Sequence, residues 1–305
     1  MRLLVSLCLL AMCLSAGCTQ SPVTTPQPVL IRIAGANSMR PVLLALTEEF
    51  SRRHANVVFD LRGGGSTLGQ QDVAAGKIDL AASILAPPAA DETIAAELRN
   101  LVRTPIGIDG LALVVHHTNK VESLTAVQLR DIFDGKLLNW QEVGGADGDI
   151  LLVSREDGSG ARMLFEERIM GAEQVSLTAI VMPTSADVVD FVGKNPLAIG
   201  YVSRSFVAAQ LTENVPGADM PPAPQSAATP VPNRAEIQTD VEVRVLAVDG
   251  EFPYINNLAA QQYPLIYPLM LVSKGAPKGW PARFVDFVLS PAGQGIVQQF
   301  SAPVR

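Results

Sequence analysis

The chain has few residues of the kinds that most often hold metals or form disulfide bonds. Its 305 residues include three cysteines and three histidines. No spacing of histidine, cysteine and carboxylate residues matches a metal-ligand pattern, so we predict no metal site and no cofactor. Cys8 and Cys13 lie in an N-terminal apolar segment. Without that segment Cys18 would be the only cysteine, which excludes an intramolecular disulfide.

An excess of positive charge is also missing. The formal net charge is −7 at pH 7. A general nucleic-acid binder needs a basic stripe that follows the phosphates, so we expect no nucleic-acid partner and only a local anion site. Hydrophobic residues make up 48% of the chain, whose length suits two globular lobes of ordinary size.

Three enzyme patterns are incomplete. Gln70 stands where a phosphate-binding loop of the Walker type needs a lysine, and Leu68 stands where a dinucleotide-binding fingerprint needs its third glycine. Ser159 lies in Gly-Ser-Gly and not in the pattern of a hydrolase nucleophile elbow. The only histidines that could serve it as a base are His54, His116 and His117. A serine hydrolase is therefore a minor alternative.

The N-terminus reads as a secretory signal. Arg2 precedes an apolar run from Leu3 to Leu14, which is too short for a dependable membrane span. The following "LSAGC" resembles a bacterial lipobox, and this resemblance implies cleavage before Cys18 and acylation of the new N-terminus. We predict a signal peptide at 1–17, a flexible proline-rich tether at 18–28, and an extracytoplasmic protein anchored to a membrane by its lipid.

After the tether, short strand-like runs alternate with amphipathic helical patterns, which is typical of an α/β fold with mainly parallel sheets. Two long apolar strands, within 107–119 and 263–275, are far apart in the sequence and indicate a chain that crosses between two lobes and later returns. We predict lobe 1 at 29–112 and 273–305, and lobe 2 at 113–272.

Residues 212–240 break this pattern, because they are rich in proline, alanine and small polar residues and have no apolar period. We predict a disordered insertion within lobe 2, since apolar patterns resume at Val241; an interdomain linker is the alternative.

Two helix starts can be predicted from capping residues. Ser123 should cap a helix that closes at Gly135, and Ser290 should cap a helix with Pro291 at its first position.

Three segments, 34–41, 62–70 and 155–165, share one order: a strand, a turn of small and hydroxyl residues, and a helix. The first turn of a helix leaves backbone N–H groups unpaired and carries partial positive charge. Several such turns brought together could bind an oxyanion. For any one of them, ordinary helix capping is the simpler explanation.

These motifs resemble a known family, the PstS-like phosphate-binding receptors of phosphate ABC importers. The likeness covers nearly all of the chain from Val29 except 212–240, and its most specific block runs from "LRDIF" to "GSGAR". The resemblance implies a two-lobed periplasmic-binding-protein fold of type II, with two hinge strands and a ligand cleft between the lobes. It also implies a monomer, phosphate as ligand, ABC permease subunits as partners and no enzymatic activity.

The resemblance implies a set of ligand-binding residues as well. Arg155 would offer its planar guanidinium to the anion, and Asp157 would hold that group in place. The remaining positions would supply hydroxyl or backbone donors. The complete expected set is Ser38, Met39, Ser66, Ser83, Arg155, Asp157, Ser159, Gly160 and Ala161.

Two positions depart from the family pattern. Ala161 stands where the family has threonine, and Ile84 stands where many members have Asp or Arg. In members with an Asp there, the resemblance implies that it accepts the proton of phosphate and so rejects sulfate, which Ile84 cannot do. Two alternatives therefore remain open: a receptor for sulfate, molybdate or tungstate, and a sensory or structural surface protein with a degenerate pocket.

Overall fold

The computed structural model describes residues 27–85, 96–211 and 242–304. The expected signal peptide, the lipidation site Cys18, nearly all of the tether and the expected insertion lie outside these ranges, so they stay predictions. Among the described helices, none combines the length and the apolar character that a membrane crossing requires.

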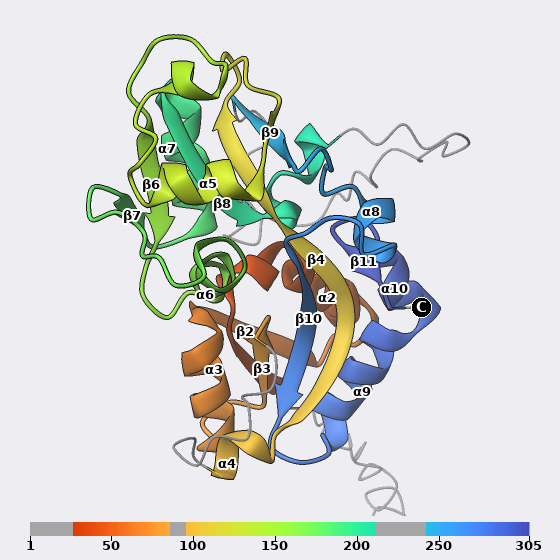
Figure 1. Cartoon of the computed structure of the whole chain (residues 1–305). Coiled ribbons are helices and arrows are strands. Elements are labelled where there is room, and N and C mark those ends of the chain that lie inside the picture. The colour runs from red at the N-terminus through yellow and green to blue at the C-terminus, as the bar shows by residue number, and fades with distance from the viewer. Residues whose placement is uncertain (1–26, 86–95, 212–241, 305) are drawn as a thin grey trace, which may run out of the picture.

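The described residues form a mixed α/β fold with a continuous, curled sheet that has two parts (Figure 1). In the first part, β1 pairs in parallel with β2 and β3, and β10 runs antiparallel to β3 and β4. The strands are β1 (Val29–Gly35), β2 (Val57–Gly64), β3 (Leu80–Ser83), β4 (Val102–His116), β10 (Ile266–Ser273) and β11 (Ala302–Pro303). The helices are η1 (Asn37–Met39), α2 (Arg40–Arg53), α3 (Gly65–Ala74), α4 (Ala96–Arg99), α9 (Gly279–Leu289) and α10 (Pro291–Val297).

The second part uses the C-terminal half of β4, which pairs with β8 and β9. Parallel pairing then continues from β8 to β6 and β7, and from β9 to β5. The strands are β5 (Ser123–Leu124), β6 (Leu151–Arg155), β7 (Ile180–Met182), β8 (Ala198–Ser203) and β9 (Val243–Val248). The helices are α5 (Ala126–Phe133), η2 (Trp140–Val143), α6 (Gly160–Phe165), η3 (Glu166–Met170), α7 (Ser185–Lys194), η4 (Arg204–Phe206) and η5 (Ala208–Gln210). Helix α8 (Ile255–Ala259) follows β9 in the chain but packs beside β11 of the first part.

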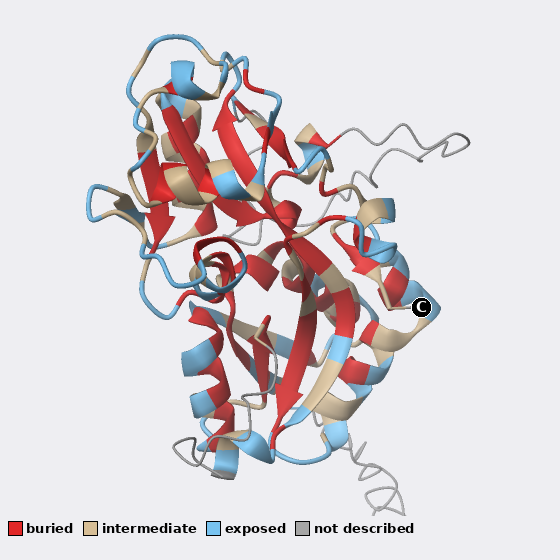
Figure 2. Ribbon diagram, in the orientation of Figure 1, coloured by how far each residue is buried: buried red, intermediate tan, exposed pale blue. Residues whose placement is uncertain are grey.

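The central strands β3 and β10 of the first part are largely buried on both faces (Figure 2), whereas β2 at the edge of the sheet is mostly exposed or half-buried. Along β10, Leu269 and Leu271 belong to the main core with α2 and α9, whereas Met270 and Val272 pack with α3. This alternation follows from the two-residue period of a strand. It fixes α3, whose N-terminus faces the second part, on one side of the sheet.

The chain crosses between the two parts within β4, as predicted. Its residues up to Gly110 pair with β10, and its residues from Leu111 pair with β8. The return crossing ends where the Leu111 amide donates to the Leu265 carbonyl (2.9 Å), just before β10 begins. Residues 266–272, expected in lobe 2, thus pair only with strands of the first part, because β10 lies between β3 and β4.

The predicted cap of the C-terminal helix is confirmed. The Ser290 hydroxyl accepts from the Gly293 amide, and Pro291 begins α10. The other predicted cap is wrong. Ser123 belongs to β5, where it pairs with Ala247 of β9. Thr125 caps α5 instead, through a reciprocal capping box with Gln128.

Candidate anion-binding site

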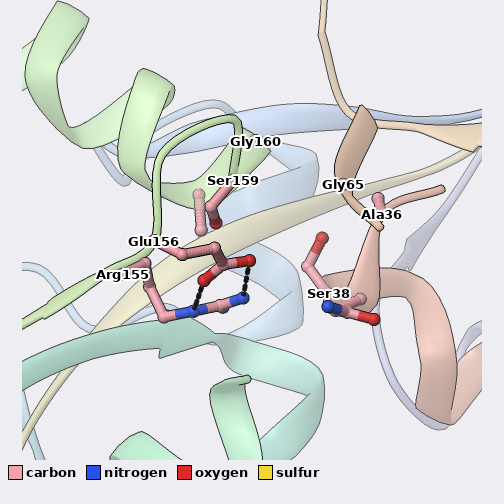
Figure 3. A pocket seen from close by; sticks show the side chains of 9 residues that line it. Ala36, Ser38, Gly65, Arg155, Glu156, Ser159 and Gly160 are labelled. Atoms are coloured by element: carbon pink, nitrogen blue, oxygen red, sulfur yellow. Dashed lines mark hydrogen bonds and ion pairs between the residues drawn. The ribbon is translucent and has the colours of Figure 1, made fainter. Parts of the chain in front are cut away.

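A small polar pocket lies where the two parts of the molecule meet. It encloses about 190 Å³, including the space open to solvent. Figure 3 shows η1 and the start of α3 on one side, facing the loop between β6 and α6 on the other. The lining residues are Ala36, Asn37, Ser38, Gly65, Arg155, Glu156, Ser159, Gly160 and Ala161. The pocket therefore joins residues from all three of the turns that the sequence singled out.

The first wall depends on a close backbone approach at the end of β1. Gly35 has φ +136°, and a Cβ there would lie 2.1 Å from the Ala82 carbonyl oxygen. Only glycine fits this position. The Ala36 amide donates to that carbonyl (2.9 Å), and the chain then turns into η1. The turn brings the buried Ser38 to the pocket, where its hydroxyl bonds no other described residue.

The opposite wall is the end of β6 and the start of α6. Ser159 is the N-cap residue of α6, but its hydroxyl makes no capping bond and lines the pocket. Gly160 and Ala161 begin the helix, so their N–H groups have no partner within it. This wall offers one hydroxyl and two backbone N–H groups to a ligand.

Arg155 is the cation of the pocket and is only 1% exposed. Its Nε and Nη2 atoms donate to the Glu156 carboxylate at 2.9 and 3.0 Å, as Figure 3 shows. The guanidinium also donates to the Met182 and Pro183 carbonyls (3.2 Å each) and to the Ser185 hydroxyl (2.9 Å). Four of its five N–H groups have partners, so the group is held firmly in one orientation.

The expected pairing of Asp157 with Arg155 is wrong. Asp157 is 93% exposed in its side chain and pairs with Arg162 Nη1 at 2.7 Å. The reason is the turn that follows β6, in which Gly158 takes φ +80° and Asp157 faces solvent. The carboxylate of the neighbouring Glu156 pairs with the Arg155 guanidinium instead.

Three other expected residues do not line the pocket. The Met39 amide is engaged with the Ala36 carbonyl (3.1 Å), and its side chain is buried. The Ser66 hydroxyl accepts from the Ile84 amide (3.2 Å). The Ser83 hydroxyl accepts from Gln70 (2.8 Å) and from the Leu85 amide (3.2 Å). Ser66 and Ser83 therefore bond to groups beside the pocket and do not line it.

Two glycines let the walls approach each other. A Cβ on Gly65 would lie 2.5 Å from the Gly158 carbonyl oxygen, across the junction of the two parts. A Cβ on Gly160 would lie 2.7 Å from both Ile84 Cγ1 and Ser66 Oγ. Ile84 thus presents hydrocarbon close to Gly160 at the start of α6. Ala161, which also lacks a polar side chain, lines the pocket itself.

A hydrogen-bonded chain connects the first wall to a buried carboxylate in β4. Asp109 Oδ2 lies 2.5 Å from Ser203 Oγ, which lies 2.7 Å from Ser205 Oγ, which in turn lies 3.2 Å from the Ser38 carbonyl oxygen. Two serine hydroxyls supply two hydrogens for these three contacts. A proton on Asp109 would complete the chain. Burial raises the pKa of Asp109 to about 6, although hydrogen bonds from Ser203 and Gly110 oppose the rise.

A curled α/β sheet in two parts, with a polar pocket at their junction, defines the class of two-lobed binding proteins. A family model described as the PBP superfamily domain matches residues 22–292, and the chain belongs to this family. Among curated proteins, it is similar to the phosphate-binding protein PstS of Bacillus subtilis, with 28% identity over 261 residues, 85% of this chain and 75% of the relative.

Solved structures give the same result. A candidate phosphate ABC transporter substrate-binding protein from Clostridium perfringens, solved with bound phosphate, is 29% identical with a TM-score of 0.71, covering 90% of this chain and 100% of that one. An ABC-type phosphate transport receptor from Vibrio cholerae is 25% identical with a TM-score of 0.62, covering 89% and 99%. The two-lobed fold predicted from the sequence is confirmed.

The sequence reasoning missed Ala36, Asn37, Gly65 and Glu156 as lining residues. Asn37 and Gly65 lie inside the turns that were singled out, so the pattern found their segments but not their orientation. For Glu156 a signal was present, because it directly follows Arg155 in a run that places two carboxylates beside one guanidinium.

Proposed function

We propose that this protein captures inorganic phosphate outside the cytoplasm and delivers it to the permease of an ABC importer, with no chemistry on the ligand. The observation that carries the proposal is the junction pocket, where a buried guanidinium lies with the first turn of α6 and with two hydroxyls that bond no other residue of the described ranges. The similar B. subtilis protein is a phosphate-binding protein, and the C. perfringens structure holds bound phosphate; both support this choice of anion.

Each side chain has a defined part in the capture. Ser38 and Ser159 donate their hydroxyl hydrogens from opposite walls, and the Gly160 and Ala161 amides donate from the start of α6. Each bond to a charged oxygen contributes about 1.5 to 3 kcal/mol. Arg155 supplies the positive charge, which burial makes more effective than it would be in water.

Glu156 must yield its place to the ligand. Its carboxylate occupies the Nε and Nη2 edge of Arg155, which is the edge that binds a planar pair of oxygens. That edge presents one N–H from Nε and one from Nη2, both of which donate to Glu156, so a second anion cannot use it at the same time. The Glu156 side chain is 32% exposed and can turn to solvent. Phosphate therefore replaces an internal carboxylate on Arg155.

The N-terminal segment would hold the binding domain at a membrane. Acylation of Cys18 would anchor the protein to a membrane, and residues 18–28 would let the binding domain reach the permease. A hydrolase using Ser159 is disfavoured, because none of the three histidines lines the pocket that contains Ser159.

Calorimetry with phosphate, sulfate, molybdate and tungstate tests the proposal. We expect one phosphate site whose affinity falls about tenfold in Ser159→Ala and in Ser38→Ala, because each change removes one donor to the anion. Ser123→Ala, at an exposed position in β5, is the matched control and should bind as tightly as the parent. Preferential binding of sulfate, molybdate or tungstate would replace phosphate as the ligand, and turnover of a chromogenic ester would contradict a purely binding role.

A further inference from the structure

A second cluster of ligand-type side chains lies far from the anion pocket. His116 is the last residue of β4, and Glu242 directly precedes β9. The two strands are antiparallel, with His116 opposite Val243, so His117 comes opposite Glu242. In Figure 1 this end of β4 and β9 lies at the top of the molecule, well away from α6. The register of the strands therefore brings together residues 125 positions apart.

Three ligand atoms converge at this corner. Glu242 Oε2 lies 3.7 Å from His117 Nδ1 and 4.0 Å from His116 Nε2, and the ligand atoms of the three residues all lie within 4.8 Å of one another. Donors bound to one tetrahedral zinc ion at about 2.0 to 2.1 Å are roughly 3.4 Å apart. Closing the difference requires rotation of both the His117 ring, which is 48% exposed, and the Glu242 side chain, which is 69% exposed.

The surroundings of His116 suit a ligand. Its ring is only 8% exposed, so the packing of β4 and β9 fixes its orientation. Its Nδ1 lies 2.8 Å from the Thr118 hydroxyl and accepts a longer bond from the Thr118 amide (3.3 Å). A metal bond at Nε2 requires the tautomer in which Nδ1–H donates to the hydroxyl and the longer bond from the amide is given up. A bond of this kind from the second ring nitrogen is typical of metal-binding histidines.

His117 and Glu242 supply access and charge. His117 is about half exposed and lies against His116 with ring centroids 4.3 Å apart. Its Nδ1 lies 3.3 Å from the Glu242 carbonyl oxygen, a weak contact that a metal bond at Nδ1 would replace. Because both residues are open to solvent, water can complete the coordination of an ion held by three protein ligands.

We propose that His116, His117 and Glu242 form a binding site for a divalent transition cation with zinc-like preferences. Two imidazoles and one carboxylate favour zinc, copper, nickel or cobalt over magnesium and calcium, which prefer all-oxygen ligands. The site is separate from the anion pocket, so the protein can hold a cation and an oxyanion at the same time.

Titration of the purified protein with zinc chloride alone, followed by calorimetry, tests the site. We expect one ion bound per chain, and cobalt in place of zinc should give the visible absorption of a site with nitrogen ligands. Loss of an outer partner of a metal ligand costs about 10- to 100-fold in affinity, so loss of a ligand in Glu242→Gln or His117→Ala should weaken binding at least tenfold. Both residues are exposed, and the variants should fold and bind phosphate like the parent.

Two comparisons keep the test decisive. Glu122→Gln changes an exposed carboxylate whose backbone pairs with Ala247, further along β9, and should leave zinc affinity unchanged. Zinc held by the cysteines of an uncleaved N-terminus would survive both ligand substitutions, and that result would overturn the proposal. If the protein failed to bind zinc at millimolar concentration, the proposal would be overturned too. The same would follow if magnesium and calcium bound as tightly as zinc.

Discussion

The buried carboxylate of Asp109 makes a strong prediction about stability. Asp109 is fully buried in β4 and accepts hydrogen bonds from Ser203, the Gly110 amide and Tyr267. Burial nevertheless raises its pKa from the ordinary 3.8 to about 6. A pKa that is higher in the folded state means that folding favours the neutral acid. The stabilising contribution is complete below about pH 4 and is lost as the pH rises through 6.

Replacing Asp109 by Asn removes the ionisation cost while keeping a neutral group of the same shape. A shift of about two pKa units corresponds to about 3 kcal/mol at pH 8 and, because the carboxyl is then only partly ionised in the unfolded chain, to about 1 kcal/mol at pH 4.5. Asp109→Asn should therefore raise the free energy of unfolding by about 2 kcal/mol more at pH 8 than at pH 4.5.

Urea unfolding at the two pH values measures this difference. Asp286→Asn, which removes an exposed carboxylate on α9, is the control and should show no such dependence. An equal effect of Asp109→Asn at both pH values, or a loss of stability at pH 8, would refute the reasoning. The same variant reports on the chain of hydroxyls, because its amide can donate to Ser203 at every pH and complete the connection to Ser38.

Three further substitutions address the pocket. Gly160→Ala should weaken phosphate binding at least tenfold in calorimetry, because the new methyl group would meet Ile84 at 2.7 Å. Gly65→Ala should also weaken binding, because its methyl group would press on the opposite wall at 2.5 Å, and small-angle scattering should show a more open molecule. Glu156→Gln should tighten phosphate binding about fivefold, since a neutral amide competes less well for the guanidinium.

Controls for these variants are available in the same chain. Gly295→Ala in α10 has no atom within 4 Å of the new methyl group and should bind phosphate normally with equal or higher stability. If Gly160→Ala bound phosphate as well as Gly295→Ala did, the start of α6 would not contact the anion. If Glu156→Gln weakened binding, the carboxylate would be a ligand partner and not a competitor.

Much of the fold and the segments of the site could be predicted from the sequence, because both rest on local patterns. The spacing of apolar residues located the strands, and glycines and hydroxyl residues ahead of a helix predicted the turns after β1 and β6. The local pattern located these turns, and the family resemblance named Ser38 and Ser159 within them as ligand residues. Their convergence required the resemblance, since no local pattern says which helix ends meet.

The remaining features depend on contacts that the sequence does not display. In the sequence, Asp157 and Glu156 are equally good candidates to pair with Arg155. The left-handed turn at Gly158 leaves Asp157 in solvent and Glu156 on the Arg155 guanidinium. The end of lobe 2 was placed too late because an apolar strand such as β10 has the same sequence pattern in either part of the sheet. Thr125 and not Ser123 caps α5, because Ser123 pairs with β9 as part of β5.

The most direct test of the central claim is a calorimetric titration of phosphate into the protein and into its Arg155→Lys variant, with the fold of each checked by thermal unfolding. Lysine keeps the charge but cannot offer the planar pair of donors, so we predict a single phosphate site that weakens at least tenfold in the variant. Absence of heat at millimolar phosphate in the parent protein, or equal affinity in a folded Arg155→Lys variant, would contradict the account.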